Sequence, residues 1–215
     1  MPATLRKLYG RPRPHLLFLH VEKTGGSSVE CATQGHDMFH HGIFTNLGHT
    51  KKPVVDRCRQ ACMHDGAPAK AVISIREPYA WWRSMYTYSY VCHEAPVCTK
   101  EHSLAGFLRE CERHIAQNWP SMAQSAYIER ECGRPCNADH HLRTERLQDD
   151  WLDLLRQLHL PLVGLPRVNP TVASEERELP PVVFTQEAVD IIHRLDANMF
   201  AEFGYRQRTD TPFEL

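Results

Sequence analysis

Short apolar runs, each followed by a segment with helical spacing, organise this chain. They cover residues 16–21, 71–75 and 141–145. Runs of this length suit strands that are buried on both faces, and strands that alternate with helices are typical of parallel sheets. The pattern therefore predicts an α/β fold, a three-layer sandwich in which a central parallel sheet, with these strands as neighbours, is flanked by helices.

The clearest helix is expected over 186–200, where Ala188, Ile191, Ile192, Leu195 and Met199 share one face. A second helix is expected to begin at Val29, and others over 54–62, 79–90, 104–114, 121–129 and 149–158. A turn at 132–136 and a Pro-containing loop at 165–181 separate the later elements. The length of 215 residues and the lack of internal repeats predict a single domain over 15–215, preceded by a flexible basic arm at 1–14.

The first apolar run ends in a loop of small and hydroxyl-bearing residues: Lys23, Thr24, Gly25, Gly26, Ser27 and Ser28. A strand, a tight loop and a helix N-terminus turn backbone N–H groups towards an anion. Glycines permit a left-handed backbone and close approach of a phosphate, while the hydroxyls and the lysine add donors and charge. The pattern favours an anion site over an ordinary turn. It differs from the nucleotide-kinase P-loop, in which the lysine follows the glycines.

The second run ends in Arg76, and Glu77, Pro78 and, further on, Ser84 follow. Proline suits the first turn of a helix. An arginine at the carboxyl end of a strand lies on the edge where open α/β sheets bind ligands, and its planar fork can hold a phosphate. The structural alternative is that Arg76 pairs with Glu77 or with a helix end.

Together the two segments resemble the sulfotransferases that use 3′-phosphoadenosine 5′-phosphosulfate (PAPS). Residues 20–28 are similar to the 5′-phosphosulfate loop, in the H-x-x-K-T-G-G-[ST]-[ST] form of carbohydrate sulfotransferases. Residues 75–78 with Ser84 are similar to the 3′-phosphate motif. Supporting similarities follow in family order at 142–147, 165–169 and 200–205, so the resemblance spans nearly the whole chain.

The resemblance implies a P-loop-like nucleotide-binding fold and a transferase that moves a sulfuryl group from PAPS to an acceptor hydroxyl, with carbohydrate acceptors favoured by the form of the loop. It implies that backbone N–H groups of 24–28 hold the 5′-phosphosulfate. Lys23 would neutralise the bridging oxygen, and Arg76 with Ser84 would hold the 3′-phosphate. No metal is expected, because a sulfuryl group carries less negative charge than a phosphoryl group.

A general base must accept the proton of the acceptor hydroxyl. In related carbohydrate sulfotransferases a histidine beyond the first loop does this, and His49 is the candidate by position. His20 and Glu22 are the alternatives.

Two other functional classes stay open at this stage. A P-loop kinase of a small molecule would need a Walker-type lysine and a metal-binding carboxylate, and neither pattern is found. A Cys/His-rich zinc-binding module is suggested by 8 cysteines and 14 histidines. Cys132, Cys136 and His140 match zinc spacing only loosely and lack an evident fourth ligand, so a local disulfide or two free thiols are preferred there.

The net charge and the hydropathy of the chain limit the kinds of partner and the compartment that we expect. The net charge of −1 gives no field that would attract nucleic acid. No apolar run approaches the ~18 residues that a membrane span needs. The opening residues lack the apolar core of a signal peptide, which favours a cytoplasmic protein, although a trimmed luminal domain of the secretory pathway stays open. Oligomeric state and the pairing of the cysteines do not follow from the sequence.

Overall fold

The computed structural model describes residues 16–33, 39–42, 70–92, 103–117, 123–167 and 182–215. The predicted arm at 1–14 and the predicted helix at 54–62 lie outside these ranges, as does most of the predicted loop at 165–181. Four strands form one parallel sheet in the order β2-β1-β3-β4: β1 (Leu16–Leu19), β2 (Phe39–Gly42), β3 (Lys70–Ile75) and β4 (His140–Arg143). The prediction of three parallel neighbouring strands is confirmed, and β2 is an additional strand that the apolar pattern missed.

The strand order creates a switch point between β1 and β3. From β1 the chain moves to β2 on one side, and the next strand, β3, lies on the other side of β1. The register pairs Leu19 with Ile73 and Ile75 with Arg143, so β1, β3 and β4 end at the same edge of the sheet. Ligands of open parallel sheets bind at such a point, and both motif segments begin there.

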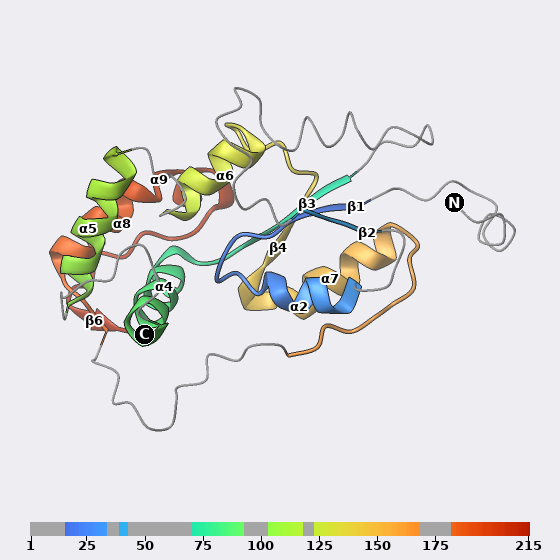
Figure 1. The fold of residues 1–215 in the computed structure, drawn as a ribbon, viewed down its shortest axis with the longest axis horizontal. Helices are drawn as coiled ribbons and strands as arrows, with labels where there is room; N and C mark the ends of the chain where they lie inside the picture. The colour runs from blue at the N-terminus through green and yellow to red at the C-terminus, as the bar shows by residue number, and fades with distance from the viewer. Residues whose placement is uncertain (1–15, 34–38, 43–69, 93–102, 118–122, 168–181) are drawn as a thin grey trace, which may run out of the picture.

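Helices cover both faces of the sheet (Figure 1). On one face, Phe18, Val72 and Leu142 pack against α2 (Gly26–Thr33) and α7 (Leu147–Gln157). On the other face, Leu19 and Ile73 pack against α6 (Gln124–Cys132) and α9 (Ala197–Phe203). Successive strand residues contribute to opposite clusters, because side chains alternate across a strand. The sheet is therefore the middle layer of three.

A third apolar cluster lies beside the sheet, where α4 (Pro78–Cys92), α5 (Leu104–Ala116) and α8 (Gln186–Leu195) pack together (Figure 1). The small antiparallel pair of β5 (Val183–Phe184) and β6 (Phe213–Glu214) adds Phe184 and Phe213 to it. Tyr79, Trp82 and Tyr86 of α4 are at most 2% exposed. This aromatic stripe is thus core, as its helical spacing predicted.

The helix predicted over 186–200 is wrong as a single element. The chain forms α8 up to Leu195 and α9 from Ala197, with Asp196 between them. Asp196 is fully buried, and its carboxylate accepts hydrogen bonds from the indole N–H of Trp82 and the backbone N–H of Ser125, both at 2.7 Å. These tertiary contacts hold Asp196 outside the helical conformation and break an otherwise continuous amphipathic pattern.

The other boundaries shift by a few residues. The strand predicted at 141–145 ends at Arg143, and a short 3₁₀ helix, η3 (Thr144–Arg146), leads into α7. Across the described residues, no helix has both the length and the apolar composition needed to cross a membrane.

Candidate anion-binding site

The loop after β1 has the backbone that its glycines predict. The chain turns between Glu22 and Gly25, and α2 begins at Gly26. Gly25 has φ +79° and Lys23 has φ +60°, so two residues of this loop occupy the left-handed region. A side chain is strained there, and Lys23 therefore carries a local conformational cost that Gly25 avoids.

Gly26 is required for a reason that the sequence did not show. A Cβ at this position would lie 2.0 Å from Cδ2 of His20, whose ring packs on the start of α2. Nδ1 of His20 lies 2.9 Å from Oε1 of Glu30, one helical turn further along α2. The absence of a side chain at 26 thus makes room for His20 as well as exposing the first N–H groups of the helix.

Thr24 joins the loop to the sheet. Its side chain is fully buried, and its hydroxyl donates to the carbonyl oxygen of Val21 at 2.6 Å and lies 2.5 Å from the hydroxyl of Ser74 in β3. The Thr144 hydroxyl lies 2.8 Å from the carbonyl oxygen of Thr24 and 3.0 Å from that of Ile75. The hydroxyl of Thr24 is therefore used within the protein, and what it offers an anion in this conformation is its backbone N–H.

Ser27 and Ser28 lie in the first turn of α2, both partly exposed. The backbone N–H of Ser28 donates to the carbonyl oxygen of Gly25 at 3.0 Å. N–H groups in the first turn of a helix lack the partner four residues earlier that later N–H groups have, and α2 has no acidic residue in that turn to neutralise them. The positive end of α2 is thus directed at the carboxyl edge of the sheet.

Arg76 connects the two motif segments directly. Its Nη1 donates to the carbonyl oxygen of Lys23 at 3.0 Å. The side chain of Gln124 holds its backbone from both sides, since Oε1 accepts from the Arg76 N–H at 2.8 Å and Nε2 donates to its carbonyl oxygen at 2.9 Å. Burial lowers the pKa of Arg76, while the charges of Glu145 and Glu77 oppose that shift. An arginine stays protonated in proteins, so this is a fixed, half-buried positive charge beside the loop.

The start of α4 is built as its sequence predicts, with Pro78 as the first helical residue. Glu77 caps this helix: its carbonyl oxygen accepts from Trp81 N at 2.9 Å and its Oε2 from Ala80 N at 2.7 Å. Burial raises the pKa of Glu77. The Trp81 indole N–H donates to the carbonyl oxygen of Glu22 at 2.7 Å, which ties α4 to the loop.

Ser84 lies two turns into α4 and is 8% exposed. No hydrogen bond among the described residues joins Ser84 to Arg76. Lys23 reaches the same helix further on, where its Nζ lies 4.1 Å from the centre of the Tyr88 ring. Tyr88 is 43% exposed, so this cation–π contact lies at the surface.

Two residues of the site, one acidic and one aromatic, were not identified individually from the sequence. Oε1 of Glu145 accepts from the backbone N–H of Glu77 at 2.7 Å, and its Oε2 accepts from the Tyr205 hydroxyl at 3.2 Å. Burial raises the pKa of Tyr205. Both residues fall within the segments 142–147 and 200–205 that support the family resemblance, and this similarity was the signal from which they could have been identified. The carboxylate of Glu145 offsets part of the positive charge of Arg76.

The three candidates for the general base differ in what the structure shows of them. His49 lies outside the described residues. His20 is paired with Glu30, an arrangement that orients an imidazole, and Glu22 is exposed. Cys132, Cys136 and His140 match zinc spacing only loosely, and within the ranges that the structure describes no group of three or more His, Cys, Asp or Glu side chains is placed to hold a metal ion.

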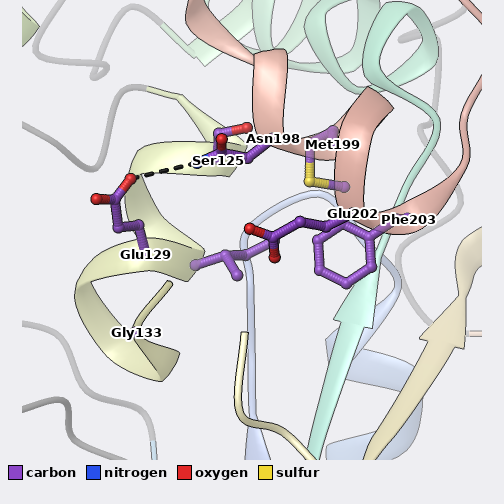
Figure 2. A pocket seen from close by; sticks show the side chains of 8 residues that line it. Ser125, Glu129, Gly133, Asn198, Met199, Glu202 and Phe203 are labelled. Carbon is purple, nitrogen blue, oxygen red and sulfur yellow. Dashed lines mark hydrogen bonds between the residues drawn. The ribbon is translucent and has the colours of Figure 1, made fainter. Parts of the chain in front are cut away.

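A separate depression lies between α6 and α9 (Figure 2). Glu129 and Asn198 face each other across it, with Asn198 Nδ2 donating to Oε2 of Glu129 at 3.3 Å. Its lining is completed by Ser125, Ile128, Gly133, Met199, Glu202 and Phe203. None of the residues predicted to bind an anion lines it.

Comparison of the chain with protein-family models, curated proteins and solved structures found no match.

Proposed function

We propose that this protein is a sulfotransferase that moves a sulfuryl group from PAPS to an acceptor hydroxyl, with a carbohydrate as the favoured acceptor. The observation that carries the proposal is the hydrogen bond from Arg76 Nη1 to the Lys23 carbonyl oxygen. Two segments that resemble the 5′-phosphosulfate and 3′-phosphate motifs are 53 residues apart in sequence and meet at the switch point of a parallel sheet.

The residues at this edge suit a nucleotide with two anionic ends. The first turn of α2 offers N–H groups with no acidic residue beside them, and Lys23 adds a mobile positive charge. Arg76 supplies a second, fixed positive charge one strand away. Glu77 and Glu145 weaken the field at Arg76, so the proposal predicts that bound phosphate would compete with these carboxylates for its guanidinium.

The chemistry proposed for the site is in-line displacement, in which positioning and charge stabilisation do most of the work. The N–H groups of residues 24–28 would hold the phosphosulfate, and Lys23 would stabilise the charge that develops on the bridging oxygen as the S–O bond breaks. Arg76 and Ser84 would select the 3′-phosphate. The base would be His49, His20 or Glu22, and the carboxylate partner of His20 supports that residue among the two that the structure describes.

Ligand preference tests the nucleotide. We expect adenosine 3′,5′-bisphosphate to bind much more tightly than adenosine 5′-monophosphate in calorimetry, and Arg76→Ala to remove roughly one to two decades of that preference, since a charge-assisted contact is worth ~1.5–3 kcal/mol. Arg113→Ala is the control, because Arg113 is exposed on α5 and pairs with Glu110 rather than with any residue of the two motif segments. Ser84→Ala probes the 3′-phosphate without removing the bond to Lys23. Equal affinity of the wild-type protein for the two nucleotides would overturn the proposal, and stronger thermal stabilisation by ATP with magnesium would favour a kinase.

Turnover tests the loop. With radiolabelled PAPS and an acceptor panel, we expect Lys23→Ala to lose most of its activity while keeping its fold. Lys70→Ala is the control, because Lys70 begins β3 at the opposite edge and binds Asp139. If Lys23→Ala kept near-normal turnover on a confirmed acceptor, the assignment of this loop would be wrong.

A further inference from the structure

Two thiols and an imidazole meet where α6 ends and the chain turns towards β4. Cys132 is the last residue of α6 and is fully buried, whereas Cys136 is partly exposed. The backbone N–H of Asn137 donates to the carbonyl oxygen of Cys132 at 3.3 Å and closes the turn between them. The side chain of Cys136 packs against the apolar cluster that contains Cys132, so the two thiols lie on the same side of the turn.

These neighbours favour the thiolate form of Cys136. Hydrogen bonds from the Cys132 side chain first, then from His141 and the backbone of Ala138, outweigh burial and lower the pKa of Cys136 to about 5. The opposing charge comes from α9, where Oε2 of Glu202 accepts from the Cys136 backbone N–H at 3.0 Å.

Cys111 in α5 shows the contrast. It is fully buried in the apolar cluster, and burial raises the pKa of its thiol. A thiolate that can be reached from solvent is reactive, whereas a buried neutral thiol is inert. Cys136 has the reactive environment, and Cys132 is placed to be its partner.

We propose that Cys136 is a peroxide-reactive modification site and that Cys132 resolves it, so that oxidation closes a disulfide across the turn at 132–136. The Cys136 thiolate attacks one oxygen of hydrogen peroxide, the O–O bond breaks, and hydroxide leaves, which yields a sulfenic acid. The Cys132 sulfur then attacks the Cys136 sulfur, forms the S–S bond and releases water with the proton of its thiol. One peroxide is thus reduced to two molecules of water, once the hydroxide takes up a proton, as two thiols become a disulfide.

The first test uses the wild-type protein and measures alkylation by iodoacetamide against pH. Trypsin does not cleave before proline, so residues 131–143 form one peptide that carries both cysteines, and tandem mass spectrometry separates them. We expect the rate at Cys136 to level off near pH 6 rather than above pH 8. At pH 6 the thiolate fraction of Cys136 would exceed that of an ordinary thiol by ~300-fold. A thiolate of low pKa is intrinsically less nucleophilic, which reduces its rate constant by ~40-fold. The net alkylation rate at Cys136 would therefore be ~10-fold higher than that of an ordinary thiol.

Cys31 is the internal reference, because it is exposed and is the sole cysteine of the tryptic peptide 24–51. A Cys136 rate that follows the same pH profile as Cys31 would overturn the proposal. His141→Gln should move the Cys136 profile to higher pH without blocking access, which a purely structural histidine would not do.

The second test measures products after brief treatment with hydrogen peroxide. In the wild-type protein the 131–143 peptide should lose two hydrogen atoms and become resistant to alkylation. Cys132→Ser should instead accumulate a dimedone-reactive sulfenic acid at Cys136, and Cys136→Ser should leave Cys132 unmodified. Cys111→Ser is the control and should behave as the wild type. Initial oxidation at Cys132, or a disulfide from Cys136 to any other cysteine, would refute the proposed roles.

Discussion

Asp196 offers a sharp test of how the elements around the site are held together. The perturbation is Asp196→Asn, at the buried junction of α8 and α9. Desolvation raises the pKa of Asp196 from 3.8 to about 6, even though the backbone N–H of Ser125 and the indole of Trp82 stabilise its charge. Ser125 lies in the first turn of α6. The N-cap residue of that helix, Ala123, makes no side-chain hydrogen bond to the helix, so the carboxylate of Asp196, at the junction of α8 and α9, caps α6 instead.

The magnitude follows from linkage. One pKa unit corresponds to ~1.36 kcal/mol, so a pKa raised from 3.8 to about 6 is worth ~3 kcal/mol. The folded state binds this proton more tightly than the unfolded chain. Its contribution to stability is therefore complete below pH 3.8 and is lost as the pH rises through about 6. The wild-type free energy of unfolding should accordingly fall by ~2 kcal/mol between pH 4 and 7, relative to a variant that cannot ionise there.

Asp196→Asn removes this titration and adds a constant penalty. An amide oxygen can accept from one of the two donors, and the NH₂ group then faces the other, which costs ~1–3 kcal/mol at every pH. Urea unfolding of both proteins at a series of pH values between 4 and 8 measures the difference, and other titrating groups cancel. Asp153→Asn, an exposed change on α7, should leave the shape of the wild-type curve between pH 4 and 8 unaltered. A difference that stays flat between pH 4 and 7, or that changes in the opposite direction, would refute the reasoning.

Two further predictions concern the loop itself. Thr24→Val should reduce the free energy of unfolding by ~1–3 kcal/mol, because it leaves the buried hydroxyl of Ser74 without its partner at 2.5 Å, and denaturant unfolding would detect the loss. Serine at position 24 restores the hydroxyl and should recover most of it. Gly26→Ala should cost ~1–3 kcal/mol by displacing the ring of His20, whose Cδ2 lies 2.0 Å from the added Cβ. Gly164→Ala, where the nearest atom lies at 3.8 Å, should be close to neutral, and equal effects at the two glycines would contradict the steric argument.

The central strands β1 and β3 were accessible from sequence because they are buried on both faces. A continuous apolar run such as Leu16–Leu19 identifies itself without any knowledge of its neighbours. The edge strand β2 was missed since its sequence, FHHG, lacks that pattern and pairs on one side only. The aromatic stripe of α4 was predicted for the same local reason, the 3.6-residue period of a helix.

Local chemistry also predicted the backbone of the loop. Glycine is the residue that accepts a left-handed φ without strain, and Gly25 adopts one. Proline suits the first turn of a helix, and Pro78 begins α4. Both inferences concern a residue and its immediate neighbours, which is why the sequence sufficed.

What only the tertiary structure decided are the contacts between distant residues. Thr24 and Ser74 are 50 positions apart, and the sequence could not show that their hydroxyls meet and withdraw the Thr24 side chain from the anion site. The sequence also could not show that the guanidinium of Arg76 donates to the carbonyl oxygen of Lys23, because the sheet brings these two segments together. The break at Asp196 arises from donors on two other helices, which override an amphipathic pattern that is continuous in the sequence. Periodicity and propensity act over a few residues, whereas a buried polar group adopts whatever geometry satisfies its hydrogen bonds, and those partners are known only once the chain has folded.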